Sequence, residues 1–495
     1  MYDALVIGSG VSGLTNALLL ARAGQRVAVV ERSPVIAPLL RGFQRWGVQF
    51  DTGFHYAGGL QYGEGLHRFF TLLGLDKHVT VEPMQTTGFD RLIANTGDFN
   101  YPFPVGPDEI VRTLCAEFPA EQAAIQRFMR DTMQVCDHLP YINPRTSVDQ
   151  LSAFDRADDV SLLEYLTDLT TNALLIKVLS LHCLLHGIAA EHVSFRFHAS
   201  VIGPYFRSAS TIVGGGLSLA HSFDVCLKEA GVELICGAEV KKILLSSNED
   251  VEGVELADGT MIHSRTVISS IHPRQTLNCL PDRVFRPIYR KRLSGLKESQ
   301  SACILFARCQ QPLHCLKGQN LYLLTDDSLP ITAQQSDYAE KKLLYVTQAN
   351  AAAGYDHGGF MVIAPMDAAH FYPWNASSLG HRPDDYLDYK GQLTAAIIAQ
   401  LEQLHPELTQ HMDRYELATP LTLRDYMHSA DGALYGVQHR VNQYPLQAVT
   451  RVKHLYLSGQ ALVAPGLMGA MISAFNTCGT ILGHARLVGE LKQCH

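Results

Sequence analysis

The stretch that decides the fold is MYDALVIGSGVSGLTNALLLARAGQRVAVVER, Met1–Arg32. Tyr2–Ile7 is a short apolar run typical of a strand, and the glycine-rich turn GSGVSG follows at once. Leu14–Ala23 is rich in Ala and Leu and predicts a helix, after which Val27–Val30 predicts a second strand. Together these elements make a complete β-α-β unit.

The glycine spacing of this turn is typical of a dinucleotide-binding site. Gly8 permits the tight turn, Gly10 lets a pyrophosphate approach the backbone, and Gly13 lets helix and strand pack closely. The start of the helix offers unpaired N–H groups to the phosphates. Glu31, 18 residues after Gly13, would accept hydrogen bonds from an adenosine ribose and disfavour the 2′-phosphate of NADP. The motif leaves NAD and FAD both open.

Composition excludes several classes of protein. A chain of 495 residues predicts two or more domains, and a net charge of −8 argues against a nucleic-acid partner. The 11 cysteines contain no C-x-x-C pair, which predicts neither a disulfide framework nor a structural zinc site. His192 and His198 have no acid of metal-site type nearby, so no metal is expected. Cysteine usage and the lack of a signal peptide favour the cytoplasm.

Two segments raise the question of membrane contact. Asn172–Ala189 is strongly apolar but is interrupted by Lys177, His182 and His186, so it falls short of a membrane span. A buried helix of a substrate domain is the preferred interpretation, and a lipid channel or a helix resting on a membrane is the alternative. The basic segment Arg286–Glu298 is interpreted as a solvated surface, with a membrane-facing patch as the alternative. Peripheral contact with a membrane therefore stays open.

The order of the remaining motifs resembles a flavin-dependent family. GSGVSG, FDTGFHY, VGGGLSLA…CGAEVKKI, ATPLTLRDYMHSADGALYGVQH and LYLSGQALVAPGLMGA follow one another as in the phytoene desaturase, carotenoid isomerase and retinol saturase superfamily. FDTGFHY and SGQ…PG..GA are more similar to the retinol saturase and carotenoid isomerase branch. The resemblance implies that the cofactor is FAD.

The implied fold is α/β: a Rossmann-like FAD-binding domain of the glutathione-reductase type, assembled from discontinuous segments, plus a mixed α+β substrate domain. Its elements are expected at the start, the middle and the end of the chain. We expect the FAD-binding domain at 1–75, 205–290 and 440–495, and the substrate-binding domain at 76–204 and 291–439.

The resemblance also implies which residues bind FAD. The backbone of Val240 would contact the adenine, and the segment from Gly459 would reach the ribityl chain and the isoalloxazine. A helix beginning near Leu467–Gly469 would direct its positive end at the flavin N1–C2=O. The expected set is Gly8, Gly10, Val11, Ser12, Gly13, Glu31, Arg32, Arg41, Gly42, Val240, Ser269, Gly459, Gln460, Gly466, Leu467, Gly469 and Ala470.

Two positions depart from the pattern of related flavoproteins. Arg41 and Gly42 stand in VIAPLLRGFQRWG, which lacks the usual paired glycine, so pyrophosphate contacts from this loop are in doubt. Gln460 stands where many flavoproteins carry Asp. An amide can still exchange hydrogen bonds with a ribityl hydroxyl.

His55 and Tyr56 are the candidate catalytic residues. His55 would exchange a proton with the substrate above the flavin, or would anchor its glycine-rich loop by hydrogen bonds. Tyr56 is a proton donor in one interpretation and a packing wall in the other.

The predicted activity is that of an FAD-dependent oxidoreductase. It would desaturate, saturate or isomerise carbon–carbon double bonds of an apolar polyene, isoprenoid or lipid. An amine-oxidase-like flavoenzyme and a non-catalytic isoprenoid-binding protein of the same fold are the alternatives. The electron partner is left open among quinone, oxygen, NAD(P)H and a redox protein.

Overall fold

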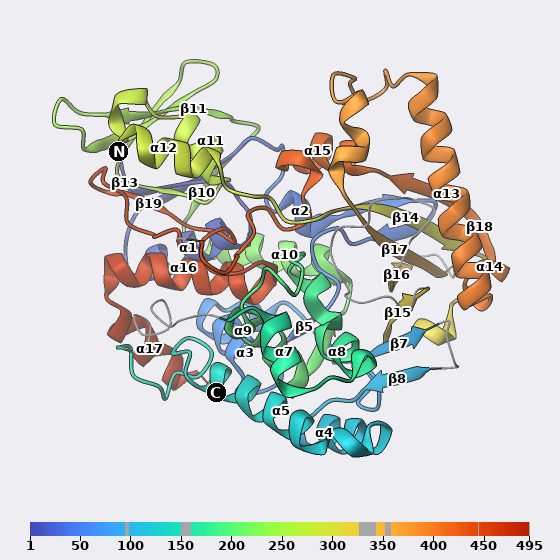
Figure 1. Ribbon diagram of the computed structural model, residues 1–495. Helices are drawn as coiled ribbons and strands as arrows, with labels where there is room; N and C mark the ends of the chain where they lie inside the picture. Colours follow the sequence, from blue (N-terminus) through green and yellow to red (C-terminus); the bar gives the residue numbers. More distant parts are fainter. Residues whose placement is uncertain (95–98, 150–159, 326–342, 352–357, 444, 495) are drawn as a thin grey trace.

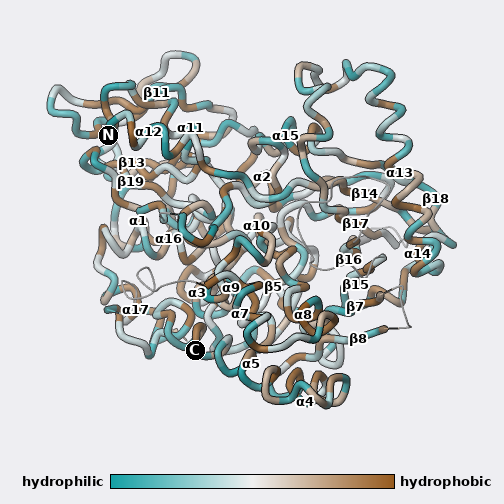
Figure 2. Tube along the Cα trace, viewed as in Figure 1, coloured by the Kyte–Doolittle hydropathy of each residue, from teal (hydrophilic) through white to brown (hydrophobic). Residues whose placement is uncertain are grey.

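The computed structural model describes residues 1–94, 99–149, 160–325, 343–351, 358–443 and 445–494. In this part of the chain the strands form three sheets (Figure 1). Figure 2 shows the apolar residues concentrated along the inner strands and the helices that cover them, whereas the outer turn beside β11 is hydrophilic.

The first sheet is the dinucleotide-binding sheet that the N-terminal motif predicts. Its parallel strands stand in the order β10 (Glu233–Cys236), β2 (Val27–Glu31), β1 (Tyr2–Ile7), β13 (Met261–Ser269) and β19 (Leu455–Leu457). The N-terminal residues of β13 pair antiparallel with β12 (Val251–Leu256), which in turn pairs antiparallel with β11 (Val240–Leu245). Segments from the start, middle and end of the chain therefore share one sheet. This confirms the expected α/β class and the Rossmann-like unit.

Helices α1 (Val11–Arg22) and α16 (Gly466–Leu482) lie side by side beneath this sheet (Figure 1). At their contact the buried Cys478 thiol of α16 donates to the Asn16 carbonyl at 3.8 Å and to the Asn16 side-chain oxygen at 3.2 Å. The same core includes α10 (Gly215–Glu229), α3 (Gly65–Leu73) and α17 (His484–Gln493).

The second sheet is mixed. Its order is β18 (Met412–Ala418), β14 (Ser301–Cys309), β17 (Gly358–Met366), β16 (Leu343–Ala351), β15 (Asn320–Leu324), β7 (Asp90–Ala94) and β8 (Asn100–Phe103), and β4 (Val48–Phe50) joins β16 with β3 (Phe43–Arg45) beyond it. Side chains alternate between its faces: Ile304 and Phe306 join one core, whereas Cys303 and Leu305 join another. The second core is closed by α13 (Asp384–Leu404) and α14 (Glu407–Gln410).

A helical layer covers the first of these cores. It consists of α4 (Pro107–Glu117), α5 (Gln122–Asp137), α7 (Leu162–Leu169), α8 (Ala173–Ser180) and α9 (Phe195–Arg207), with the 3-10 turns η2 (Pro119–Glu121) and η3 (Leu181–Leu185). The apolar run Asn172–Ala189 lies here, and most of it is buried, as the preferred interpretation states. None of the helices in the described ranges is long and apolar enough to cross a membrane.

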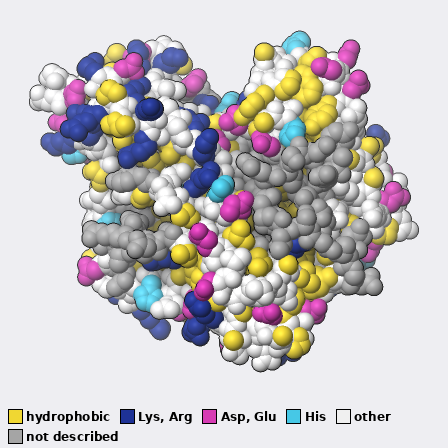
Figure 3. All heavy atoms as spheres, viewed as in Figure 1, with side chains coloured by type: hydrophobic (Ala, Val, Ile, Leu, Met, Phe, Trp, Pro, Cys, Tyr) yellow, Lys and Arg dark blue, Asp and Glu magenta, His cyan; other side chains and the backbone are white. Residues whose placement is uncertain are grey.

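Smaller elements complete the description. A short sheet joins β5 (Ala57–Gly58), β9 (Ala209–Ile212) and β6 (Val81–Pro83). Short helices are α2 (Pro38–Arg41), α11 (Pro273–Asn278), α12 (Pro287–Ser294) and α15 (Pro420–Met427). Figure 3 shows Lys and Arg side chains gathered near α11 and α12, where Arg286, Lys291 and Arg292 are exposed.

Candidate functional site

The expected cofactor residues gather at one edge of the first sheet. β1, β2, β13 and β19 run parallel, so their carboxyl ends meet there. Gly8 directly follows β1 and Arg32 directly follows β2. Gly459 follows β19 with one residue, Ser458, between them. In parallel α/β sheets this edge is where ligands bind.

Gly13 and Gly10 of the first turn are suited to glycine for different physical reasons. A Cβ added at Gly13 would lie 2.0 Å from the Gly8 carbonyl oxygen, so only glycine lets α1 pack this closely on β1. A Cβ added at Gly10 would meet no atom within 4 Å, and Gly10 has an ordinary φ of −65°. Gly10 therefore leaves open space beside the start of α1, where no side chain caps the helix and no acid stands in the first turn. A phosphate fits this cradle.

Glu31 is held against that turn. Its carboxylate accepts hydrogen bonds from the Ser9 N–H at 2.8 Å, the Ser9 hydroxyl at 2.7 Å and the Ser33 N–H at 2.8 Å. These contacts fix the acid at the end of β2, whereas Arg32 is exposed. His428 lies near enough to both for their charges to act on it, although burial is the main cause of its lowered pKa. His428 lies within the motif ATPLTLRDYMHSADGALYGVQH but is not among the expected site residues.

A buried hydroxyl and amide network joins the first turn to the C-terminal motif. The Ser12 and Ser458 hydroxyls are 2.7 Å apart, and the Asn16 amide donates to the Ser458 hydroxyl at 2.8 Å. The Gly459 N–H donates to the Ser473 hydroxyl of α16 at 2.9 Å. The relative positions of the two predicted cofactor segments are thus fixed by side chains, of which sequence reasoning identified only Ser12.

The second helix start repeats the properties of the first. Pro465 precedes α16 without a capping side chain, and no acid stands in the first turn. Gly466 has φ +80° and open space where a Cβ would stand, whereas a Cβ at Gly469 would lie 2.3 Å from the Ala464 carbonyl oxygen. Leu467 is buried and Ala470 half-buried. The positive end of α16 is therefore free to face an electron-rich ligand atom.

Gln460 is exposed at the same edge, and its backbone is anchored by His439, which ends the motif ATPLTLRDYMHSADGALYGVQH but is not among the expected site residues. His439 Nε2 lies 2.9 Å from the Gln460 carbonyl oxygen, and its ring stacks on Phe197 at 4.8 Å. Burial lowers the pKa of His439 to about 4, so its imidazole is neutral at pH 7 and can donate one hydrogen bond.

The other expected cofactor residues have partners within the protein. Arg41 Nε donates to the Ile36 carbonyl at 2.7 Å, and Gly42, at φ +55°, passes so close to Phe50 that a Cβ would lie 2.0 Å from its carbonyl oxygen. The Val240 carbonyl lies 3.7 Å from the Cys279 thiol. The Ser269 hydroxyl is buried against that of Thr276 at 2.7 Å.

Ser270, which follows Ser269, contacts the first glycine turn. Its hydroxyl donates to the carbonyls of Ile7 at 2.9 Å and Gly8 at 3.1 Å. Its position one residue beyond β13 is the signal that could have identified it.

His55 lies in the segment between β4 and β5. Its ring is half-buried, stands 6.3 Å from the Tyr345 ring, and has no side-chain hydrogen bond to a described residue. Burial lowers its pKa to about 4, so it is a neutral imidazole at pH 7. Gly59, directly after β5, packs on the first turn of α16: a Cβ there would lie 2.6 Å from Met468 Cε.

Tyr56 points into a buried polar network that the motifs missed. Its hydroxyl donates to Asp90 at 2.8 Å, and Asp90 also accepts from His182 Nε2 at 3.0 Å and Asn320 Nδ2 at 2.9 Å. Burial, and then the charge of Asp90, raise the pKa of Tyr56. Asp90 is fully buried, and its donors come from remote parts of the chain. The network therefore fixes Tyr56 beside His55.

Three comparisons bear on this arrangement. Residues 6–73 match the model of the NAD(P)-binding Rossmann-like domain family. The chain is 28% identical to the all-trans-retinol 13,14-reductase of Rattus norvegicus over 99% of this chain and 87% of that protein. It is 24% identical to the chloroplastic prolycopene isomerase of Arabidopsis thaliana, over 95% of this chain and 82% of that protein.

The fold is also that of a solved oxidase. The structure of a putrescine oxidase bound to putrescine aligns with a TM-score of 0.64 at 15% identity, covering 97% of this chain and 99% of that one. The whole length of the chain thus has counterparts in known oxidoreductases and isomerases. The chain fits the retinol saturase and carotenoid isomerase branch, as its motifs predicted.

Proposed function

We propose that the protein is an FAD-dependent oxidoreductase that acts on carbon–carbon double bonds of an apolar polyene, isoprenoid or lipid. The observation that carries the proposal is the pair of helix starts at α1 and α16. Each has open space at a glycine, Gly10 or Gly466, and neither has a capping side chain or a first-turn acid. The Ser12–Ser458 contact fixes one start relative to the other.

These features fit the pyrophosphate, the adenosine ribose and the isoalloxazine ring of FAD. The start of α1 would bind the pyrophosphate, and Glu31 the adenosine ribose. The start of α16 would place its partial positive charge beside the ring system. Bound FAD supplies hydride or electron transfer that amino-acid side chains lack.

The side chains around His55 and Tyr56 suit an apolar substrate better than a charged one. His55 is neutral at pH 7, and the aromatic rings of Tyr56, Tyr205, Tyr322 and Tyr345 are close to one another. The buried carboxylate of Asp90 is already satisfied by three donors, so it is unavailable to pair with an ammonium group. The relatives named as retinol reductase and prolycopene isomerase support a polyene substrate. His55 would exchange one proton with a substrate carbon, and the enclosing side chains would exclude water.

The test combines cofactor identification with a turnover assay. Protein purified without added cofactor should show a flavin spectrum, and the released chromophore should have the mass of FAD. Under anaerobic conditions, with the flavin chemically reduced, a panel of retinoids and cis-carotenoids should yield a product that has gained two hydrogens or is an isomer. Oxidation of putrescine with release of peroxide, and no change in any polyene, would establish the amine-oxidase alternative instead. A protein that takes up no FAD would support the isoprenoid carrier.

A further inference from the structure

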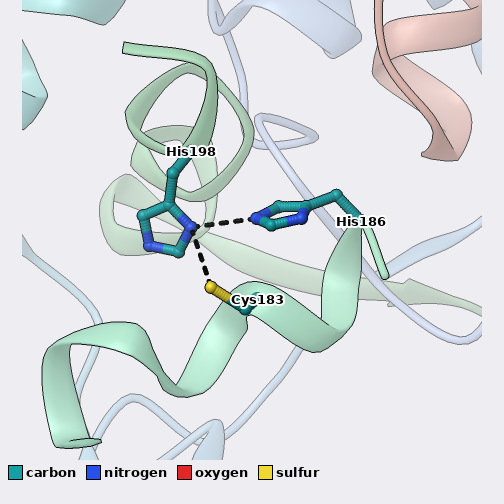
Figure 4. Close-up of side chains that lie close together, drawn as sticks. All are labelled: Cys183, His186 and His198. Carbon is teal, nitrogen blue, oxygen red and sulfur yellow. Dashed lines mark hydrogen bonds between the residues drawn. The ribbon is translucent and has the colours of Figure 1, made fainter. Parts of the chain in front are cut away.

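A second group of chemistry-bearing side chains lies outside the residues used above. Cys183 and His186 lie on and directly after η3, and His198 lies on α9 (Figure 4). All three are buried, with exposed fractions of 4%, 1% and 0%. The sequence predicts no metal site, because the spacing considered there joins His198 with His192 and no suitable acid stands nearby. In the structure the ring of His198 contacts that of His186 instead.

We propose that Cys183, His186 and His198 bind one zinc ion. The atoms that would ligate the metal already converge: His186 Nε2 lies 3.0 Å from His198 Nδ1, and Cys183 Sγ lies 3.9 Å from the same nitrogen. All three ligand atoms lie within 4.8 Å of one another. Tetrahedral zinc, with bonds of about 2.0–2.1 Å to nitrogen and about 2.3 Å to sulfur, separates two nitrogens by roughly 3.3 Å and a nitrogen from a sulfur by roughly 3.6 Å. These two separations lie within a few tenths of an ångström of the tetrahedral values, and zinc would draw Cys183 Sγ and His186 Nε2 together from a separation of at most 4.8 Å.

Zinc binding requires changes in protonation. Burial lowers the pKa of His186 and of His198, so both rings are neutral; one of the two facing nitrogens donates to the other, so its ring must carry the proton on its other nitrogen before both can bind the metal. Burial raises the pKa of the Cys183 thiol. Zinc binding would form a Zn–S bond and release the thiol proton to solvent, so affinity should increase with pH.

Three buried polar atoms beside the group have no hydrogen-bond partner within the described residues: His186 Nδ1, His198 Nε2 and Glu191 Oε2. The two ring nitrogens are the ones that do not converge on the proposed metal, so they stay available to donate once zinc is bound. Glu191 lies close enough to Cys183 for its charge to raise the pKa of the thiol, after the larger effect of burial. A zinc ion, a thiolate and a carboxylate sum to zero charge, which is the condition under which a buried ionic site is tolerated.

The site would fix a segment that borders the candidate cofactor region. The Gln300 N–H donates to the Gly187 carbonyl at 3.1 Å, and a Cβ at Gly187 would lie 2.9 Å from the Tyr435 ring. Zinc would join this segment to α9. The proposal does not depend on the flavin, and its test does not use activity.

The experiment is zinc analysis of the full-length protein after removal of any affinity tag. The protein is loaded with zinc, passed through a desalting column, and measured by elemental analysis and X-ray absorption at the zinc edge. We expect one zinc per chain, with one sulfur at about 2.3 Å and the remaining ligands nitrogen or oxygen at about 2.0–2.1 Å. Less than stoichiometric zinc, or a shell without sulfur, would overturn the proposal.

A matched control is present in the same chain. Cys315, His405 and Glu407 form a similar but less buried group, with Glu407 exposed. Cys183→Ser should remove the sulfur shell, whereas Cys315→Ser should retain it; the reverse pattern would assign the metal to the other group and overturn the proposal. His198→Gln should weaken zinc binding by more than the roughly 10–100-fold typical of losing a group outside the ligand shell. Circular dichroism checks that each variant is folded. If a variant does not fold, the zinc ligands measured by X-ray absorption on the wild-type protein decide between the two groups.

Discussion

The hydroxyls of Ser12 and Ser458 lie 2.7 Å apart across a sequence separation of 446 residues. Both side chains are buried, and the Asn16 amide donates to Ser458 as well. Ser12 belongs to α1, and Ser458 directly follows β19, the last strand of the dinucleotide-binding sheet. Their contact therefore fixes the two halves of the candidate cofactor site before any ligand binds.

Ser458→Ala should destabilise the protein and weaken cofactor binding together. The substitution leaves buried polar groups of Ser12 and Asn16 short of a partner, which costs about 1–3 kcal/mol. Urea unfolding should show the loss of stability, and titration with FAD should show a raised Kd. Thr480→Ala, at an exposed hydroxyl of α16, is the control and should change stability by less than about 0.5 kcal/mol. Equal effects of the two variants would contradict a special role for Ser458.

The first glycine turn should respond in opposite ways at two positions. At Gly10 an added Cβ meets no atom within 4 Å, so Gly10→Ala should fold with near wild-type stability and lose FAD affinity. At Gly13 the added Cβ would lie 2.0 Å from the Gly8 carbonyl oxygen, so Gly13→Ala should fold poorly with or without FAD. Thermal unfolding and flavin content measured on both variants separate the two effects. Unchanged FAD content in Gly10→Ala would contradict the placement of the pyrophosphate.

Local sequence predicted the dinucleotide-binding sheet because its elements are short and lie next to their turns. The two strands and the helix of the N-terminal β-α-β unit are all found close to the expected ranges. Local sequence also explains why α4 and α5 are separate helices: Phe118 leaves the helical conformation ahead of Pro119.

Long-range side-chain contacts could not be predicted in the same way. Asp90 is a polar residue at the start of β7, and nothing near it in sequence indicates that Tyr56, His182 and Asn320 converge on it. The convergence of Cys183 and His186 with His198 likewise depends on how η3 packs against α9. One sequence carries the residue types but not the packing that brings them together.

His55→Gln and Tyr56→Phe should separate chemistry from stability. His55 has no side-chain hydrogen bond in the described structure, so His55→Gln should leave the unfolding midpoint almost unchanged. If His55 is the proton-exchanging residue, turnover should fall by about 10²–10⁴-fold.

Tyr56→Phe instead removes one of the donors to Asp90 and should cost about 1–3 kcal/mol of stability. Chemical denaturation and turnover assays on both variants provide the comparison. A stable His55→Gln variant with wild-type turnover would leave His55 as a loop residue only.

Acid should destabilise the protein in a window set by its buried histidines. Burial lowers the folded-state pKa of His55 and of His439 to about 4, below the ordinary histidine value of 6.5. Between pH 6.5 and about 4 the unfolded state therefore binds protons that the folded state does not, and stability decreases as pH falls through this range. Each histidine contributes at most about 1.4 kcal/mol per pH unit, and less where solvent screens it.

His439→Gln should therefore flatten the pH dependence of the unfolding free energy below pH 6.5 and leave it unchanged above pH 7. Glutamine can still donate a hydrogen bond to the Gln460 carbonyl, so the fold should persist at neutral pH. Urea unfolding at half-unit pH steps measures the slope, and His78→Gln, at an exposed histidine, is the control that should follow the wild-type curve. A His439→Gln slope equal to that of the wild-type protein would mean that His439 takes up its proton in the folded state, and that its contact with Gln460 is open to water.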